Sequence, residues 1–84
     1  MAFTGGPEDA AALEAGRRHV GMGYERLWMA YFALGGNHQA ADVESWLRGN
    51  FRIPPRDFDL VALALNETLA EHERPYSVRY TSDM

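Results

Sequence analysis

The chain of 84 residues contains no cysteine and no lysine. Without cysteine it can form neither a disulfide nor a thiolate metal site, two devices that often stabilise small domains. A chain of this length has room for one hydrophobic core, and it buries only about 60–65% of the surface that it exposes when unfolded. We therefore expect its stability to come from tight helix packing or from self-association.

Positive charge is also scarce. All eight cationic residues are arginines, and the formal net charge is −4. An acidic balance argues against broad binding to nucleic acid or to anionic membranes, because both depend mainly on positive charge. It leaves room for a local basic patch.

Long hydrophobic runs are missing as well. The longest strongly apolar stretch, Leu27 to Leu34, is far too short to span a bilayer. Residues 1–7 have neither the basic start nor the apolar run of a signal peptide. We therefore expect a cytoplasmic protein with no membrane partner.

What remains is a helical pattern. It predicts an all-α fold, a small bundle of three to four helices with an extended C-terminal segment at residues 76–80. We expect a flexible tail over residues 1–6, one helical domain over 7–80 and a flexible C-terminus at 81–84. The short predicted loops favour antiparallel neighbours in the bundle.

The first predicted helix begins at Pro7, a residue suited to the first helical position. Gly21 and Gly23 then lower the helix propensity, because each costs up to about 1 kcal/mol relative to alanine. We expect a break or a kink at residues 21–23. One continuous helix over residues 8–34 is the alternative.

Residues 24–34 form the most apolar predicted helix. Its apolar side chains cover an arc of roughly 200°, whereas a surface helix needs only about 100°. This arc contains Tyr24, Leu27, Trp28, Ala30, Tyr31, Phe32 and Leu34. We therefore expect this helix to be the buried centre of the domain. Asn37 is a good N-cap for a following helix over residues 38–48.

Pro54 and Pro55 open the last predicted helix, which covers residues 56–72. It has a core stripe on one side and a second apolar ridge, Leu60 and Leu63, on the other. Met29 likewise falls outside the apolar arc of its own helix.

Exposed apolar patches usually mark interfaces, so Met29, Leu60 and Leu63 are our candidate partner interface. The alternative is that the connecting segments at residues 51–53 and 76–80 cover this surplus apolar surface.

We find no pattern typical of a catalytic or metal site. The three histidines, His19, His38 and His72, lack ligand spacing, and no serine lies in a nucleophile motif. The glycines follow no predicted strand, so they do not indicate a phosphate-binding loop. We therefore expect no enzyme, no catalytic or metal-binding residues and no cofactor.

Residues 24–48 could form a helix-turn-helix, in which the second helix directs its N-terminal residues to the bases. Those residues would be His38 and Gln39, but Asp42 and Glu44 would then face the phosphates. The candidate contacts to an anion or to nucleic acid are five arginines in two groups: Arg17 and Arg18, then Arg48, Arg52 and Arg56.

The sequence thus predicts a small helical interaction or regulatory module that binds another protein, most simply as a homodimer. A dimer would bury either the Leu60 and Leu63 ridge or the alanine-rich first helix. The alternative is a nucleic-acid-associated transcriptional regulator that uses the helix-turn-helix-like segment and the arginines.

Overall fold

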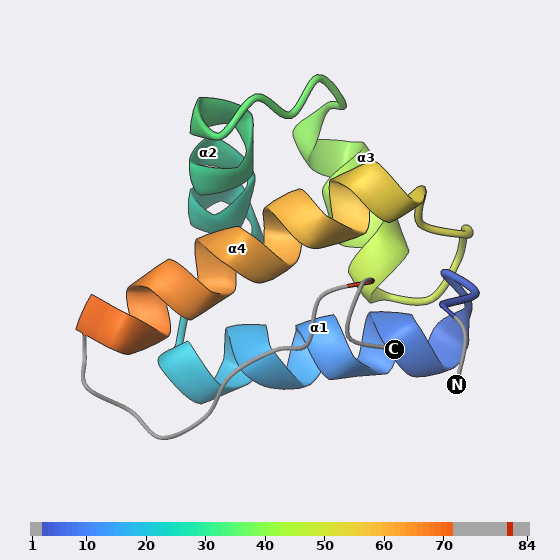
Figure 1. Ribbon diagram of the computed structural model, residues 1–84, viewed down its shortest axis with the longest axis horizontal. Coiled ribbons are helices and arrows are strands. Elements are labelled where there is room, and N and C mark those ends of the chain that lie inside the picture. Colours follow the sequence, from blue (N-terminus) through green and yellow to red (C-terminus); the bar gives the residue numbers. More distant parts are fainter. Residues whose placement is uncertain (1–2, 72–80, 82–84) are drawn as a thin grey trace.

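The computed structural model describes residues 3–71 and residue 81, and this part of the chain contains four helices and no strand (Figure 1). The helices are α1 (Pro7–Val20), α2 (Tyr24–Ala33), α3 (Ala40–Leu47) and α4 (Pro55–Glu71). The predicted all-α bundle is confirmed. The extended segment predicted at residues 76–80 lies outside the described residues.

The glycine-rich segment at residues 21–23 separates two helices, as the sequence predicts. Gly21 ends α1 with a φ of 70°, in the left-handed region that glycine adopts without strain. Its N–H donates to the carbonyl of Arg18 at 3.1 Å. The alternative of one continuous helix from residue 8 to residue 34 is therefore wrong.

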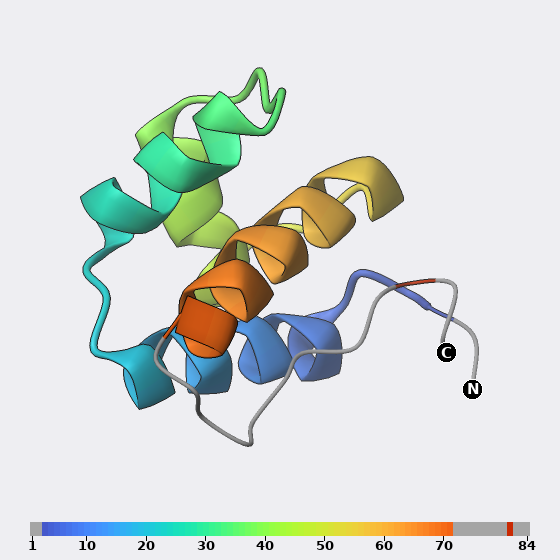
Figure 2. The same cartoon turned by 60° about the vertical axis from the view of Figure 1, so that its left-hand side comes forward.

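The buried centre of the bundle is α4. It packs against both α1 and α2, and Figures 1 and 2 show it crossing between them. It also supplies the largest group of buried apolar residues: Phe58, Val61, Ala62, Ala64, Leu65 and Leu69.

Helix α2 is peripheral, so the prediction that residues 24–34 form the buried centre is wrong. Only Leu27 and Tyr31 of α2 are buried. The wide apolar arc misled the prediction because part of it, with Phe32, faces solvent.

Figures 1 and 2 show the relative directions of two pairs of helices. Helices α2 and α3 are antiparallel neighbours, as the short connection predicts, whereas α1 and α4 run in the same general direction. None of the described helices is long and apolar enough to cross a membrane.

Helix α3 starts later than the sequence suggests. Its N-cap is Gln39, whose N–H donates to the carboxylate of Asp42 at 3.1 Å. That bond satisfies a free donor at the helix start, and the negative charge of Asp42 suits the helix dipole. The prediction of Asn37 as the N-cap is therefore wrong.

The segment before α1 is packed on the domain. The carboxylate of Asp9 accepts a hydrogen bond from the N–H of Gly5 at 2.8 Å, and the Gly5 carbonyl accepts one from Ile53 at 2.9 Å. The Phe3 ring lies 4.9 Å from the Phe58 ring, centroid to centroid. The packed part of the chain thus already includes Phe3, within the segment that we expected to be a flexible tail.

Candidate interaction surface

The outer side of α2 exposes large apolar side chains. Met29 is 59% exposed and Phe32 is 55% exposed, and the two lie one turn apart on the helix. Glu25, Arg26 and Ala33 are exposed beside them. Figures 1 and 2 show α2 at one edge of the molecule, so this side, which we call the outer α2 face, has no neighbouring helix among the residues that the structure describes.

Trp28 lies beside the outer α2 face and is held by the loop before α3. Its indole N–H donates to the carbonyl of His38 at 2.9 Å, which fixes the ring against the loop before α3. The Trp28 and Phe32 rings are 5.4 Å apart. The exposed Phe32 ring therefore packs against an aromatic ring that is itself held in place. This contact restricts the Phe32 side chain and so limits the conformational entropy that it would lose on binding.

Of the three residues predicted for a partner interface, Met29 is the most exposed. Leu60 and Leu63 are half-buried on α4, and Leu60 packs against the core. Met29 is on the side of α2 opposite to Leu27, so the structure does not bring it together with the α4 pair.

The sequence pattern does not reveal the exposure of Phe32, because it predicts this residue inside the buried arc of the same helix. Two features could have revealed it. Phe32 follows Met29 by three positions, so the two lie on the same side of the helix. On the helical wheel Phe32 also lies next to Glu25, a charged residue that favours a solvent-exposed position.

The arginines regroup in the structure. The guanidinium carbon of Arg17 lies 4.0 Å from the centre of the Tyr24 ring, and that of Arg48 lies 5.3 Å from it. Tyr24 thus brings together one arginine from each predicted group. Such cation–π contacts stabilise a folded domain without any ligand.

Acidic partners occupy this arginine cluster. Arg17 makes two hydrogen bonds of 2.7 Å to Glu14, and Arg18 makes one of 3.3 Å to the same carboxylate. Arg48 pairs with Glu44 at 2.9 Å. The hydrogen bond from Arg17 lowers the pKa of Glu14, against the opposing effect of its burial, and the same bond raises the pKa of Arg17.

The other two candidate arginines hold loops in place. Arg52 donates to the Thr4 carbonyl at 2.6 Å, and Arg56 donates to the Gly35 carbonyl at 2.7 Å. They bind different parts of the chain and do not form an anion site with Arg48.

A polar cluster that the sequence did not reveal joins α2 to α4. The Tyr31 hydroxyl donates to the buried Asp57 carboxylate at 2.7 Å, and it accepts a bond from the backbone N–H of His38 at 3.2 Å. Burial, and then the bond to Asp57, raise the pKa of Tyr31.

The His38 ring completes this cluster. Its Nε2 is 3.6 Å from Asp57, and its Nδ1 is 3.5 Å from Asp42. In the described part of the chain no group of three or more histidines and carboxylates is arranged to hold a metal ion. Because the ring lies between two carboxylates before α3 begins, His38 is poorly placed to read DNA bases.

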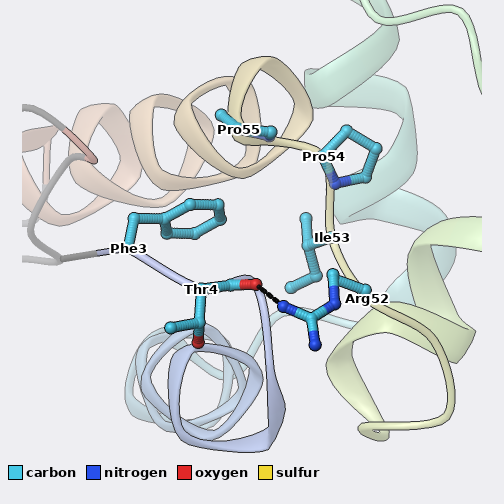
Figure 3. Close-up of a pocket in the computed structure, with 6 residues that line it drawn as sticks. All are labelled: Phe3, Thr4, Arg52, Ile53, Pro54 and Pro55. Carbon is cyan, nitrogen blue, oxygen red and sulfur yellow. Dashed lines mark hydrogen bonds between the residues drawn. The ribbon is translucent and has the colours of Figure 1, made fainter.

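A cavity lies where the N-terminal segment meets the start of α4 (Figure 3). It has a volume of about 350 Å³ and is lined by Phe3, Thr4, Arg52, Ile53, Pro54 and Pro55. Figure 3 shows the guanidinium of Arg52 turned to the Thr4 carbonyl. A ligand site needs several converging polar groups to orient its ligand, and this lining offers few.

In comparisons with known proteins, no family model, no curated protein and no solved structure matches this chain.

Proposed function

We propose that this chain is a small helical protein-binding module that acts by contact and not by catalysis. The outer α2 face is its contact surface. The observation that carries this proposal is the exposure of Met29 and Phe32 side by side on one helix face. Large apolar residues that cluster on a surface usually mark an interaction site.

The composition of this face suits an interface. Methionine, aromatic residues and arginine are enriched in interface cores, and the outer α2 face carries one of each in Met29, Phe32 and Arg26. Fully burying a side chain of the size of Met29 or Phe32 is worth about 1.5–3 kcal/mol. Burial of both side chains would supply a substantial share of the binding free energy of a weak complex.

We propose self-association as the simplest form of this binding. Light scattering coupled to gel filtration, over a wide range of protein concentration, tests it. The mass of the wild-type protein should rise with concentration, whereas Met29→Glu and Phe32→Glu should stay monomeric, because each would bury a charge in the contact.

Phe51→Glu is the matched control, because Phe51 is 68% exposed and lies in the connection between α3 and α4. It should associate like the wild type. Circular dichroism of each variant shows whether the helices are intact. A wild-type protein that stays strictly monomeric at high concentration would count against self-association.

The other predicted surface, the α4 ridge, is separable in the same experiment. Leu63→Ser should leave the association unchanged if the outer α2 face is the contact. Loss of association in Leu63→Ser alone would move the interface to α4.

Nucleic-acid binding, the alternative function predicted from the sequence, has less support. The five candidate arginines contact acids or backbone carbonyls of their own chain. A titration of DNA at low salt tests it, since contacts to phosphate are strongest there.

A further inference from the structure

We infer that His38 acts as a pH-sensitive switch: its protonated ring joins the start of α3 to the start of α4, and the link weakens when the ring is neutral. The ring lies between two carboxylates. Its Nδ1 is 3.5 Å from Asp42 Oδ2, in the first turn of α3, and its Nε2 is 3.6 Å from Asp57 Oδ2, in the first turn of α4. This inference goes beyond the proposed function, because it concerns the inside of one chain and needs no partner.

The chemistry of the imidazole ring makes this link depend on a proton. A neutral ring has one N–H donor and one nitrogen that only accepts, whereas both nitrogens of a protonated ring donate. An ionised carboxylate only accepts. A neutral His38 can therefore offer a donor to Asp42 or to Asp57 but not to both, and its other nitrogen then directs a lone pair at a carboxylate oxygen.

The two distances point to the charged ring as well. Both are longer than the usual hydrogen-bond length of about 2.7–3.2 Å, so the attraction is mainly that between opposite charges. A neutral ring has no such charge. The two pairs are unequal: the Asp57 side chain is only 6% exposed, whereas Asp42 is exposed and its pair is better screened by water. The pair with Asp57 therefore contributes the larger share.

The backbone of His38 is held in place by bonds that do not involve the ring. Its N–H donates to the Tyr31 hydroxyl at 3.2 Å, and its carbonyl accepts from the Trp28 indole at 2.9 Å. The ring itself lies 4.9 Å from the Trp46 ring, centroid to centroid. Loss of the proton therefore changes the strength of the link to α4, while the ring stays between the two helices.

The other charged or titratable groups around this ring come from α2 and α4. The Tyr31 hydroxyl donates to Asp57 Oδ1 at 2.7 Å, and burial raises the pKa of Tyr31 above its ordinary value. Arg56 Nη1 is 3.9 Å from the same oxygen, and an arginine keeps its charge at every accessible pH. Histidine is the one side chain whose ordinary titration falls between about pH 5 and pH 8. In that range the charge of the cluster therefore changes at His38.

The sign of the pH dependence follows from the geometry. Folding places the protonated ring beside two negative charges, and unfolding separates it from them. The stability that His38 adds is therefore present below about pH 6.5, where histidine ordinarily titrates, and it is lost as the pH rises further.

Urea denaturation at about pH 5.5 and at about pH 8 tests this switch. We compare the wild type with His38→Gln, so that the contributions of the other two histidines cancel. On going from the lower to the higher pH, the urea midpoint of the wild type should fall relative to that of His38→Gln. Only this change with pH is used, so a constant cost of the substitution does not matter.

Two further variants test the carboxylates, and each keeps an oxygen that can accept a hydrogen bond. Asp57→Asn should remove more than half of the pH dependence that His38 causes, and Asp42→Asn should remove a smaller part. Glu44→Gln is the matched control, because it removes a carboxylate of α3 that pairs with Arg48. It should keep the pH dependence of the wild type.

Two outcomes would overturn the inference. The first is an equal change of the midpoint with pH in the wild type and in His38→Gln. The second is a change of wild-type size in both Asp42→Asn and Asp57→Asn, because the proton on His38 would then act through other groups. If His38→Gln does not fold, the comparison of Asp42→Asn with Glu44→Gln still decides: equal pH dependence in these two would contradict the switch.

Discussion

The hydroxyl of Tyr31 donates a hydrogen bond of 2.7 Å to the carboxylate of Asp57, and so joins α2 to the first turn of α4 across 26 positions of the sequence. Both residues are buried. The negative charge of Asp57 also lies where the dipole of α4 favours it. One side chain thus stabilises the start of the central helix and anchors the peripheral one.

Tyr31→Phe should destabilise the fold by about 1–3 kcal/mol, because it leaves a buried carboxylate with one donor fewer. Urea denaturation followed by circular dichroism measures the change. Tyr24→Phe is the matched control. It also removes a hydroxyl bond, of 3.0 Å to Glu14, but from a half-exposed ring, so its cost should be smaller. Equal costs would show that burial of the Asp57 bond does not matter.

The same bond predicts a loss of stability at alkaline pH. The folded state raises the pKa of Tyr31 above its ordinary value of about 10, chiefly through burial. At a pH between the unfolded-state and the folded-state pKa of Tyr31, the unfolded chain has lost a proton that the folded chain keeps. Rising pH therefore favours unfolding there, while below about pH 10 the contribution is fully present.

Urea midpoints measured from about pH 9 upward test this slope. The stability of Tyr31→Phe should fall less steeply than that of the wild type. Parallel curves for the two proteins would contradict a raised Tyr31 pKa.

Gly36→Ala should be destabilising by about 1–3 kcal/mol, the range for overpacking a core. A Cβ at Gly36 would collide with the Tyr31 ring, which cannot move without breaking its bond to Asp57. Gly23→Ala is the control, because a Cβ there meets no other atom of the described residues. Thermal denaturation compares the two, and a Gly36→Ala protein as stable as Gly23→Ala would argue against this close contact.

Phe3→Ala should cost about 1–3 kcal/mol, because the half-buried Phe3 ring packs on Phe58. Phe51→Ala removes an equal side chain from a position that is 68% exposed, and it should cost much less. Chemical denaturation of the two variants gives the difference. Similar costs would mean that the N-terminal segment adds no packing energy.

Glu14→Gln should make the free energy of unfolding depend less steeply on pH in the acid range. The bond to Arg17 lowers the folded-state pKa of Glu14 below its ordinary value near 4.5. The stability that this bond adds is therefore present above about pH 4.5 and is lost as the pH falls through the lower folded-state value. Glu67→Gln, at an exposed position on α4, is the control and should keep the wild-type slope in acid unfolding experiments.

The sequence predicts the helices well where local signals decide. The glycines at 21 and 23 separate α1 from α2, and Pro54 and Pro55 define the start of α4. The start of α3 was misplaced because the pairing of Gln39 with Asp42 competes with the intrinsic preference of Asn37 for a cap position.

The candidate surface could be predicted only in part. A helical wheel gives the width of an apolar arc but not which neighbours cover it. The sequence pattern therefore predicts the exposure of Met29 but not that of Phe32. The bond between Tyr31 and Asp57 has no local signal, because its partners lie on different helices. The same holds for the ring of Tyr24, which is contacted by Arg17 on α1 and by Arg48, the residue that follows α3.

The bond from Ile53 to Gly5 has a consequence for the order of folding. The segment before α1 is synthesised well before its partners Ile53 and Phe58. Contacts so distant in sequence form only after the intervening loop has closed. On the ribosome, the segment before α1 therefore stays undocked until Ile53 and the start of α4 have emerged.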